Sequence, residues 1–373
     1  MKNKIPVFSF VLFLSVFILL ISYGEQKPRW KGTIEKENGV TVIKNPKEPL
    51  YSGDILSLEE ELTIGEEEKE PVFEAIRTIR VDDDGNIYVL DYKAYQIKVF
   101  DETGKHLRDI SRKGQGPGEM QLPRGMEIIG GKKIVIDDFR NRRISFFSLE
   151  GELLKEIPTS EISGLAVVTP DSRGQFIGYT LHMRGNTLTE LIKFDENLEV
   201  IKEIGKIEYT RESKVVNPFP PMLFFTVLQD DRVVWGKCYH YQLMIVDREG
   251  ETIRKIINAY DPIKITDDDK KRETEERFKG RKLPPGMSLK FPEYYPAFRW
   301  ISSDDEGRIF VRTFERDEEG NRYYDMFDSE GRYIAKIILR NHPTTWKKGK
   351  LYCAIEDEDG FHQVKRYKVT WKY

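Results

Sequence analysis

The chain has 373 residues, of which 39% are hydrophobic, 12% aromatic and 33% charged, and its formal net charge is −3. This composition is enough for both a core and a wetted surface, and the absence of a basic stripe argues against a nucleic-acid partner. The length is large for one ordinary domain, but it suits a single ring built from repeats of about 40–45 residues.

The N-terminus has the pattern of an export signal. Lys2 and Lys4 precede an apolar run over residues 5–21, and residues 22–24 supply the small side chains that a signal peptidase reads. We therefore expect residues 1–24 to be a signal peptide and the protein to be periplasmic or extracellular. Because the apolar run is longer than a typical signal core, the alternative is an uncleaved anchor, which would then be the chain's only membrane contact.

Two segments separate this signal from the repeats. Residues 25–51 are polar, and we expect a tether there with one short strand at residues 40–43. Residues 55–64 alternate apolar and polar side chains, which is typical of a half-buried strand.

A strand-like motif then returns at a constant step of 47 residues. Phe100-Asp101, Phe147-Ser148 and Phe194-Asp195 each close an apolar-alternating run. The same step maps Ile87, Asp91, Ile97 and Gly104 onto Ile134, Asp138, Ile144 and Gly151. A period in the 40s built from strand-like segments indicates a β-propeller, in which each repeat is one four-stranded blade.

The last hairpin of the repeat occurs in five copies, at residues 100–110, 147–157, 194–204, 246–256 and 327–337. Four copies have glycine in the turn, where a tight hairpin needs a positive φ. The third copy has Leu198 instead, and we expect its turn to differ.

A partial sixth unit over residues 351–371 lacks a fourth strand, and residues 55–64 can supply it. We therefore expect an all-β fold over residues 52–373. It is a six-bladed β-propeller of four-stranded antiparallel blades, with the last blade closed by an N-terminal strand. Such closure removes the open edge of the ring.

Two stretches resemble NHL-type repeats. Residues 114–119 (GQGPGE) are similar to the family's glycine-proline-glycine linker, and residues 138–147 (DFRNRRISFF) match its D-x-x-N-x-R-I-x-x-F strand pair. The resemblance implies a six-bladed propeller and is strongest to uncharacterised exported bacterial members. It also implies that Asn141 and Arg143 brace neighbouring loops. Some related propellers are lyases or hydrolases with a channel metal, but no matching ligand set occurs in this chain.

A non-repeat insertion over residues 260–295 lies between the fourth and fifth repeats. Thr266 and Asp269 have the spacing of a helix N-terminal capping box, and the charged residues that follow predict a surface helix. The insertion is either a lid or side wall over the channel mouth, or a solvated segment packed on one edge of the ring.

The cysteines predict no cross-link. Cys238 and Cys353 fall in repeats four and six, with a whole blade between them, so we expect free and mostly buried thiols.

Propeller ligands usually bind on the face formed by the loops between strands two and three and by the loops between blades, and long loops are often functional. Here these loops carry arginines and aromatic residues, which suit a sugar, an acidic metabolite or a peptide. The candidate ligand-binding residues are Tyr92, Tyr95, Arg140, Arg142, His182, Arg184, Tyr239, His240, Tyr294, Tyr295 and Arg316.

The sequence predicts no cofactor and no metal site. A metal shared by His182 and His240 across the channel is the alternative, but the five histidines are irregularly spaced and the acidic runs lack calcium-loop spacing. Metalloprotease, serine-hydrolase and phosphate-loop motifs are also absent from the sequence.

We therefore expect an exported, non-catalytic propeller that binds a small molecule or an envelope protein. The alternative is a lyase or hydrolase with its active site at the channel mouth. The enzyme hypothesis would be favoured if at least three side chains from one set lay within reach of a shared metal ion. The set is His182, His240, Asp91, Asp138 and Glu315. A third hypothesis is a purely structural module of the cell envelope.

Overall fold

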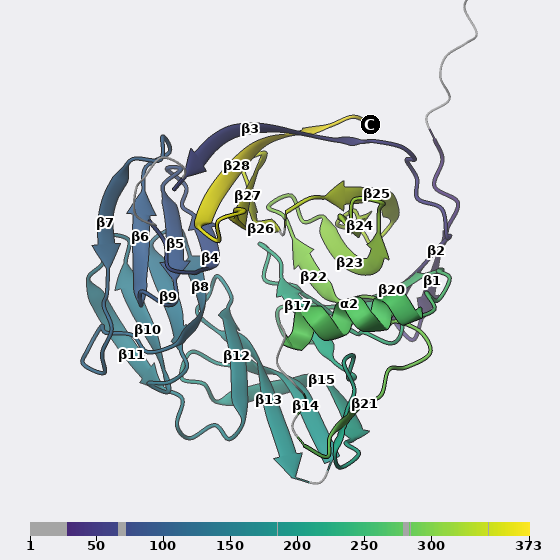
Figure 1. The fold of residues 1–373 in the computed structure, drawn as a ribbon, viewed down its shortest axis with the longest axis horizontal. Coiled ribbons are helices and arrows are strands. Elements are labelled where there is room, and N and C mark those ends of the chain that lie inside the picture. Colours follow the sequence, from purple (N-terminus) through teal and green to yellow (C-terminus); the bar gives the residue numbers. More distant parts are fainter. Residues whose placement is uncertain (1–27, 66–71, 185, 279–282, 284, 342) are drawn as a thin grey trace, which may run out of the picture.

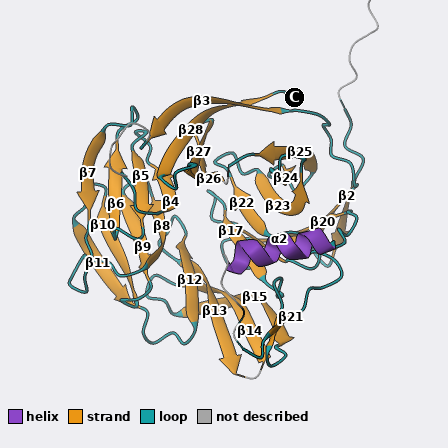
Figure 2. Ribbon diagram, viewed as in Figure 1, coloured by secondary structure: helices purple, strands orange, loops and turns teal. Residues whose placement is uncertain are grey.

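The computed structural model describes residues 28–373, except residues 66–71, 185, 279–282, 284 and 342. These residues form six blades around a central channel (Figure 1). Figure 2 shows that strands dominate, and within the described residues α2 (Asp267–Phe278) is the single helix. No helix in this part of the chain has the length and apolar character needed to cross a membrane. The signal predicted at residues 1–24 lies outside the described residues.

Blades one to three follow one another along the chain, and each is a sheet of four consecutive antiparallel strands. Blade one consists of β4 (Ile76–Val81), β5 (Ile87–Asp91), β6 (Gln96–Phe100) and β7 (His106–Ile110). Blade two consists of β8 (Pro123–Ile129), β9 (Lys133–Asp138), β10 (Arg143–Ser148) and β11 (Leu153–Pro158). Blade three consists of β12 (Leu165–Pro170), β13 (Phe176–Arg184), β14 (Asn186–Phe194) and β15 (Val200–Thr210).

Blades four to six complete the ring. Blade four consists of β17 (Leu223–Val227), β18 (Val233–Lys237), β19 (Gln242–Val246) and β20 (Thr252–Asn258). Blade five consists of β22 (Trp300–Ser303), β23 (Ile309–Arg316), β24 (Arg322–Phe327) and β25 (Tyr333–Leu339). Blade six consists of β26 (Pro343–Lys347), β27 (Lys350–Glu356), β28 (His362–Trp371) and the N-terminal β3 (Leu56–Ile64).

The predicted closure of the last blade by an N-terminal strand is confirmed. β3 pairs antiparallel with β28 from Ile64 opposite Val364 to Leu56 opposite Trp371. Glu61 of β3 also forms an ion pair with Lys350 of β27, at 3.1 Å. The N-terminal strand β3 thus supplies the outer strand of the blade that contains the C-terminal strand β28.

Residues 33–45 form a hairpin in the segment predicted as a tether. The strands β1 (Thr33–Glu37) and β2 (Val40–Asn45) extend the sheet of blade four, because β2 pairs in parallel with β20. Val42 and Ile43 are buried. The side chain of Asn45 donates a hydrogen bond to the Gly331 carbonyl oxygen, 2.9 Å away in blade five. This segment is therefore attached to blade four by strand pairing and to blade five by the Asn45 hydrogen bond.

The hydrophobic core is divided into wedges between neighbouring blades. Tyr88 of β5 belongs to the wedge between blades one and two, together with Ile134 of β9. Its neighbour Ile87 belongs to the wedge between blades one and six, together with Val364 of β28. Alternate side chains of β5 therefore enter different wedges, which explains why every residue of this strand is buried.

An aspartate fixes the repeated hairpin turn. One carboxylate oxygen of Asp101 accepts hydrogen bonds from the backbone N–H groups of Thr103, at 2.9 Å, and Lys105, at 3.0 Å. Asp195 makes the equivalent pair of bonds in blade three, both at 2.8 Å. The Phe-Asp motif thus places a buried ring at the end of a strand and a turn cap directly after it.

The expectation of a different turn at Leu198 is wrong. Leu198 adopts a φ of 67°, and its N–H bonds to the Asp195 carbonyl oxygen at 3.1 Å. Gly104 makes the corresponding bond to Asp101 at 3.0 Å. The leucine side chain is buried in the wedge between blades two and three. This burial offsets the strain of a positive φ, so the same turn forms without glycine.

The insertion begins with the predicted capping box. The Thr266 side-chain oxygen accepts a bond from the Asp269 N–H at 3.1 Å, and the Thr266 N–H donates to the Asp269 carboxylate at 2.9 Å. Further along the insertion, β21 (Ser288–Leu289) pairs in parallel with β16 (Val215–Val216). The insertion therefore contacts the loop between blades three and four. Helix α2 packs beside them, against blades four and five (Figure 1).

Both cysteines are buried and free, as predicted. Cys238 follows β18 in blade four, and Cys353 lies in β27 of blade six. Burial raises the pKa of both thiols, to about 12 for Cys353, so neither is a reactive thiolate near neutral pH.

Candidate functional site: the central channel

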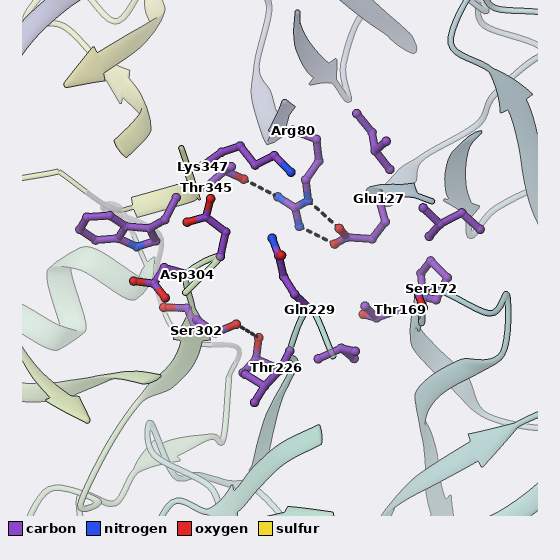
Figure 3. A pocket seen from close by; sticks show the side chains of 18 of the residues that line it. Arg80, Glu127, Thr169, Ser172, Thr226, Gln229, Ser302, Asp304, Thr345 and Lys347 are labelled. Atoms are coloured by element: carbon purple, nitrogen blue, oxygen red, sulfur yellow. Dashed lines mark hydrogen bonds and ion pairs between the residues drawn. The ribbon is translucent and has the colours of Figure 1, made fainter. Parts of the chain in front are cut away.

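The channel holds a cavity of about 680 Å³, lined by the innermost strand of every blade. Each of these strands contributes at least one polar side chain, and Figure 3 shows one from each strand around the cavity. These side chains, which we call the channel collar, are Arg80, Glu127, Thr169, Thr226, Ser302 and Thr345. Strand alternation contributes to this arrangement, because Ile79 and Val81 on either side of Arg80, and Met126 and Ile128 on either side of Glu127, belong to the wedges between blades.

The collar's two charged residues pair with each other. The Arg80 guanidinium donates two hydrogen bonds to the Glu127 carboxylate, one of 2.6 Å from Nε and a second from Nη2 (Figure 3). It also donates to the Thr345 hydroxyl at 3.0 Å. Burial alone would lower the pKa of Arg80, but the charge of Glu127 and its hydrogen bonds together outweigh burial, so the pKa is raised. The opposite charges of the two side chains therefore compensate each other within the collar.

The buried carboxylates at the channel mouth also have hydrogen-bond or ion-pair partners within the protein. Asp82 accepts bonds from the N–H groups of Asp84 and Asn86 in its own turn, at 2.9 and 2.8 Å. Asp304 has the same turn geometry and an ion pair with Arg308 at 2.5 Å. Burial raises the pKa of Asp304, and the Arg308 charge opposes that rise. These acids hold the turns of the mouth.

Asp171 and Asp231, on the blade-three side of the mouth, also bind partners within the protein. Asp171 lies 3.3 Å from the buried ammonium of Lys193. Asp231 accepts bonds from both the N–H and the hydroxyl of Ser172, at 2.8 and 2.7 Å. Because these carboxylates are already satisfied, they do not form an open ligand set for a cation.

Neutral groups remain on the channel wall. Gln229 is exposed, and its amide extends into the cavity in Figure 3. The hydroxyls of Thr169 and Ser172 face the same space. Trp300, which is 45% exposed, adds an aromatic surface to the wall. The channel thus offers hydroxyls, an amide and an indole ring beside ionic groups that are already paired.

The eleven predicted ligand residues lie elsewhere. None of them lines the channel cavity, which extends to the turns between strands one and two. The predicted residues belong mainly to loops between strands two and three, at the other end of antiparallel blades, and to the insertion. The structure brings three of them near a cluster that contains Phe219 and Phe314. The Tyr239 hydroxyl donates to the Phe219 carbonyl oxygen, and the Tyr295 ring stacks on Phe314 with the ring centroids 4.6 Å apart. Arg316 pairs with Glu276 of α2 at 3.2 Å.

The other predicted residues remain separate. His182 pairs with Glu190 of its own hairpin at 3.6 Å, whereas His240 is exposed in blade four. Lys113 lies over the Tyr95 ring, and Arg142 donates to the Ser160 carbonyl oxygen. Tyr92 is half-buried, Arg140 and Tyr294 are exposed, and Arg184 lies at the end of β13.

The carboxylates proposed for a metal-dependent alternative have structural partners. Asp91 accepts bonds from the N–H groups of Glu74 and Ala75, at 2.7 and 3.0 Å, and Asp138 accepts one from Gln121 at 2.8 Å. Glu315 binds the Lys336 ammonium at 2.6 Å. Over the described residues, no group of three histidine, cysteine or acidic side chains could hold a metal ion.

The bracing role of Asn141 and Arg143 is confirmed. The Asn141 amide donates to the Gly114 carbonyl oxygen at 3.0 Å. The Arg143 guanidinium donates to the carbonyl oxygens of Gly116 and Glu119, both at 2.7 Å. Both side chains therefore fix the glycine-rich linker between blades one and two.

Sequence reasoning missed the channel collar. Neither Arg80 nor Glu127 is among the predicted site residues, although they are separated by the repeat step of 47. That step was the available signal, because equivalent positions on innermost strands of successive blades face the same channel.

Comparison with known proteins agrees with this architecture. A model of the DUF5128 family, described as a 6-bladed beta-propeller, matches residues 66–226. No curated protein sequence matches the chain significantly.

Solved structures extend the likeness to most of the ring. A protein from Bacteroides fragilis NCTC 9343 described as a "Putative exported protein" is 12% identical, with a TM-score of 0.58 over 89% of this chain and 100% of that one. A DUF4221 family member from Bacteroides vulgatus ATCC 8482 is 12% identical, with a TM-score of 0.50 over 85% and 99%. Virginiamycin B lyase from Staphylococcus aureus is 11% identical over 84% and 99%, but its TM-score of 0.42 is too low to support an argument. The two Bacteroides structures show a shared propeller fold.

Proposed function

We propose that this protein is a non-catalytic binding propeller that holds a neutral, hydroxyl-rich ligand, such as a sugar, in its central channel. The observation that carries the proposal is a large channel cavity in which Arg80 pairs with Glu127, Asp171 with Lys193 and Asp304 with Arg308, and which also presents hydroxyls and an amide. A charged ligand would compete with those ion pairs, whereas a neutral polyol can bond to Thr169, Ser172 and Gln229 without breaking them.

The exposed indole of Trp300 supports the same class of ligand. It lies on the channel wall two residues before Ser302 of the collar. Aromatic faces pack against the apolar faces of sugar rings while polar groups bond to the ring hydroxyls.

We also propose that the protein acts outside the cytoplasm and that its repeats are of the NHL type. Export is supported by the signal pattern at residues 1–24 and by the assignment made for the Bacteroides fragilis structural relative. The NHL type is supported by the linker contacts of Asn141 and Arg143.

Isothermal titration calorimetry tests the channel as the binding site. The chain starting at Glu25 is titrated with neutral mono- and oligosaccharides. We expect Gln229→Ala to weaken the binding of a sugar ligand about tenfold, because it removes hydrogen bonds at the wall. Gln115→Ala, at an exposed linker position outside the cavity, is the matched control and should bind normally. Failure of all sugars to bind, or equal binding by both variants, would contradict the proposal.

A further inference from the structure

A second cavity, of about 310 Å³, lies between the inner strands of blades four and five, the loop before blade four and helix α2. We call it the arginine-aromatic pocket. Its aromatic walls are Phe219, Phe224, Phe298, Phe314 and Trp300. Met222 also lines it and is 46% exposed. A ligand can therefore reach apolar surface here without any rearrangement of the blades.

Three arginines line the same pocket. They are Arg277 from the last turn of α2, Arg299 from the segment before β22, and Arg312 from β23. Arg277 donates to the Pro218 carbonyl oxygen at 3.2 Å. In the part of the chain that the structure describes, Arg299 Nη1 and Arg312 Nε are buried and make no hydrogen bond. The Arg299 side chain as a whole is 40% exposed and Arg312 also interacts with Tyr324, but these two buried N–H groups have no acceptor of their own. Buried N–H groups rarely lack one, so the two positions point to an acceptor supplied by a ligand.

The surrounding charges favour an anion. Behind the pocket wall, Arg316 and Arg322 of blade five pair with Glu276 of α2, at 3.2 and 3.9 Å. The nearest carboxylate to Arg299 belongs to Glu273, whose oxygen lies 3.8 Å from Nη1.

Arg312 has no carboxylate within 4.0 Å among the described residues, so positive charge exceeds negative charge at this end of blade five. Burial lowers the pKa of Arg312, and the charges of Arg299 and Arg316 lower it further. Burial and the same neighbours lower the pKa of Arg322 to about 10. An anion in the pocket would relieve this repulsion.

We propose that the arginine-aromatic pocket binds a small aromatic carboxylate, whose carboxylate group is received by Arg299 and Arg312 and whose ring packs among the phenylalanines. Arginine forks match the two oxygens of a carboxylate, and aromatic rings stack or meet edge to face in such a space. This site is independent of the proposed sugar site, because the two cavities share only Trp300 among their lining residues. The insertion supplies one wall of it through Arg277, so α2 completes a pocket beside the channel.

Calorimetry with three probes tests the class of ligand. Phenylacetate should bind the chain starting at Glu25 with one-to-one stoichiometry. Phenylacetamide, which has the same shape without the charge, should bind at least about tenfold more weakly, as should inorganic phosphate, which has charge without a ring. Equal binding of the amide would overturn the role of the arginines. Equal binding of phosphate would overturn the role of the aromatic walls.

Matched variants test the residues. Arg312→Met should weaken phenylacetate binding about 10- to 100-fold, whereas Arg332→Met should leave it unchanged. Arg332 lies in the same blade, at the turn before β25, and pairs with Asp328. Unchanged affinity in Arg312→Met would overturn the proposal. If a thermal melt shows that this variant does not fold, Arg299→Met and the acid-versus-amide comparison in the unaltered chain decide the question by the same criteria.

Discussion

Arg80 of β4 and Glu127 of β8 occupy equivalent positions of successive blades, and their side chains form a two-bond ion pair on the channel wall. Their side chains are 25% and 29% exposed, so the pair lies between a surface salt bridge and a fully buried one. One repeat step of 47 residues therefore becomes a direct contact between two blades.

This pair should be energetically coupled. We expect Arg80→Met to lower the free energy of unfolding by about 2–4 kcal/mol, because it leaves the Glu127 carboxylate partly buried and unpaired. Glu127→Gln should cost less, about 1–2 kcal/mol, because Arg80 keeps its bond to Thr345. Urea unfolding of both variants and of the double variant measures the coupling. Strictly additive losses would show that the two charges do not stabilise each other.

The closing strand should be essential for stability. Deleting residues 1–65 removes β3, which buries Leu56 and Ile64 and pairs along β28. We expect the melting temperature to fall by roughly 10 °C or more relative to the chain starting at Glu25, because blade six loses its outer strand.

A chain starting at Ser52 is the intermediate control. It lacks the β1–β2 hairpin but keeps β3, so its melting temperature should lie between the other two. Equal melting temperatures for the chains starting at Glu25 and Glu66 would contradict closure of the ring by β3.

Asp137 should make stability depend on pH. Burial raises its pKa to about 7; the Arg124 charge opposes that rise and the Asp138 charge adds to it. An unfolded aspartate titrates near pH 4, so between about pH 4 and 7 the folded chain binds more protons than the unfolded chain. The contribution of Asp137 to the free energy of unfolding therefore falls as the pH rises through this window.

Asp137→Asn tests this dependence, because asparagine does not ionise. At pH 8 the variant should be more stable than the unaltered chain by about 1–4 kcal/mol, and at pH 4 the difference should nearly vanish. Urea unfolding at both pH values provides the measurement. Asp268→Asn, at an exposed side chain of α2, is the control and should follow the unaltered chain. A pH profile that Asp137→Asn leaves unchanged would rule out this role of Asp137.

Leu198→Gly should destabilise blade three. Glycine would relieve the positive φ by about 1 kcal/mol, but it would remove a buried leucine side chain worth about 2–4 kcal/mol. We expect a net loss of about 1–3 kcal/mol in urea unfolding. A gain in stability would mean that backbone strain, rather than core packing, dominates at this turn.

Local patterns in the sequence were sufficient to predict the architecture. The step of 47 residues predicted blades, alternation predicted strands, and the unpaired strand at residues 55–64 predicted closure of blade six. The spacing of Thr266 and Asp269 predicted the start of α2. These features depend on neighbouring residues or on a fixed period, so they are readable without coordinates.

The location of the cavities was decided only by tertiary structure. Gln229 and Trp300 line the same channel cavity, and Arg277 and Arg312 line the second pocket. The members of each pair lie far apart in the sequence, and no shared local motif links them. Their proximity depends on how turns and the insertion pack once the ring has closed. The sequence by itself determined the number and order of the blades, because alternation and repeat period are encoded locally. Which end of the channel is hollow, and which arginine N–H groups in the second pocket have no hydrogen bond, depends on long-range packing that no local pattern specifies.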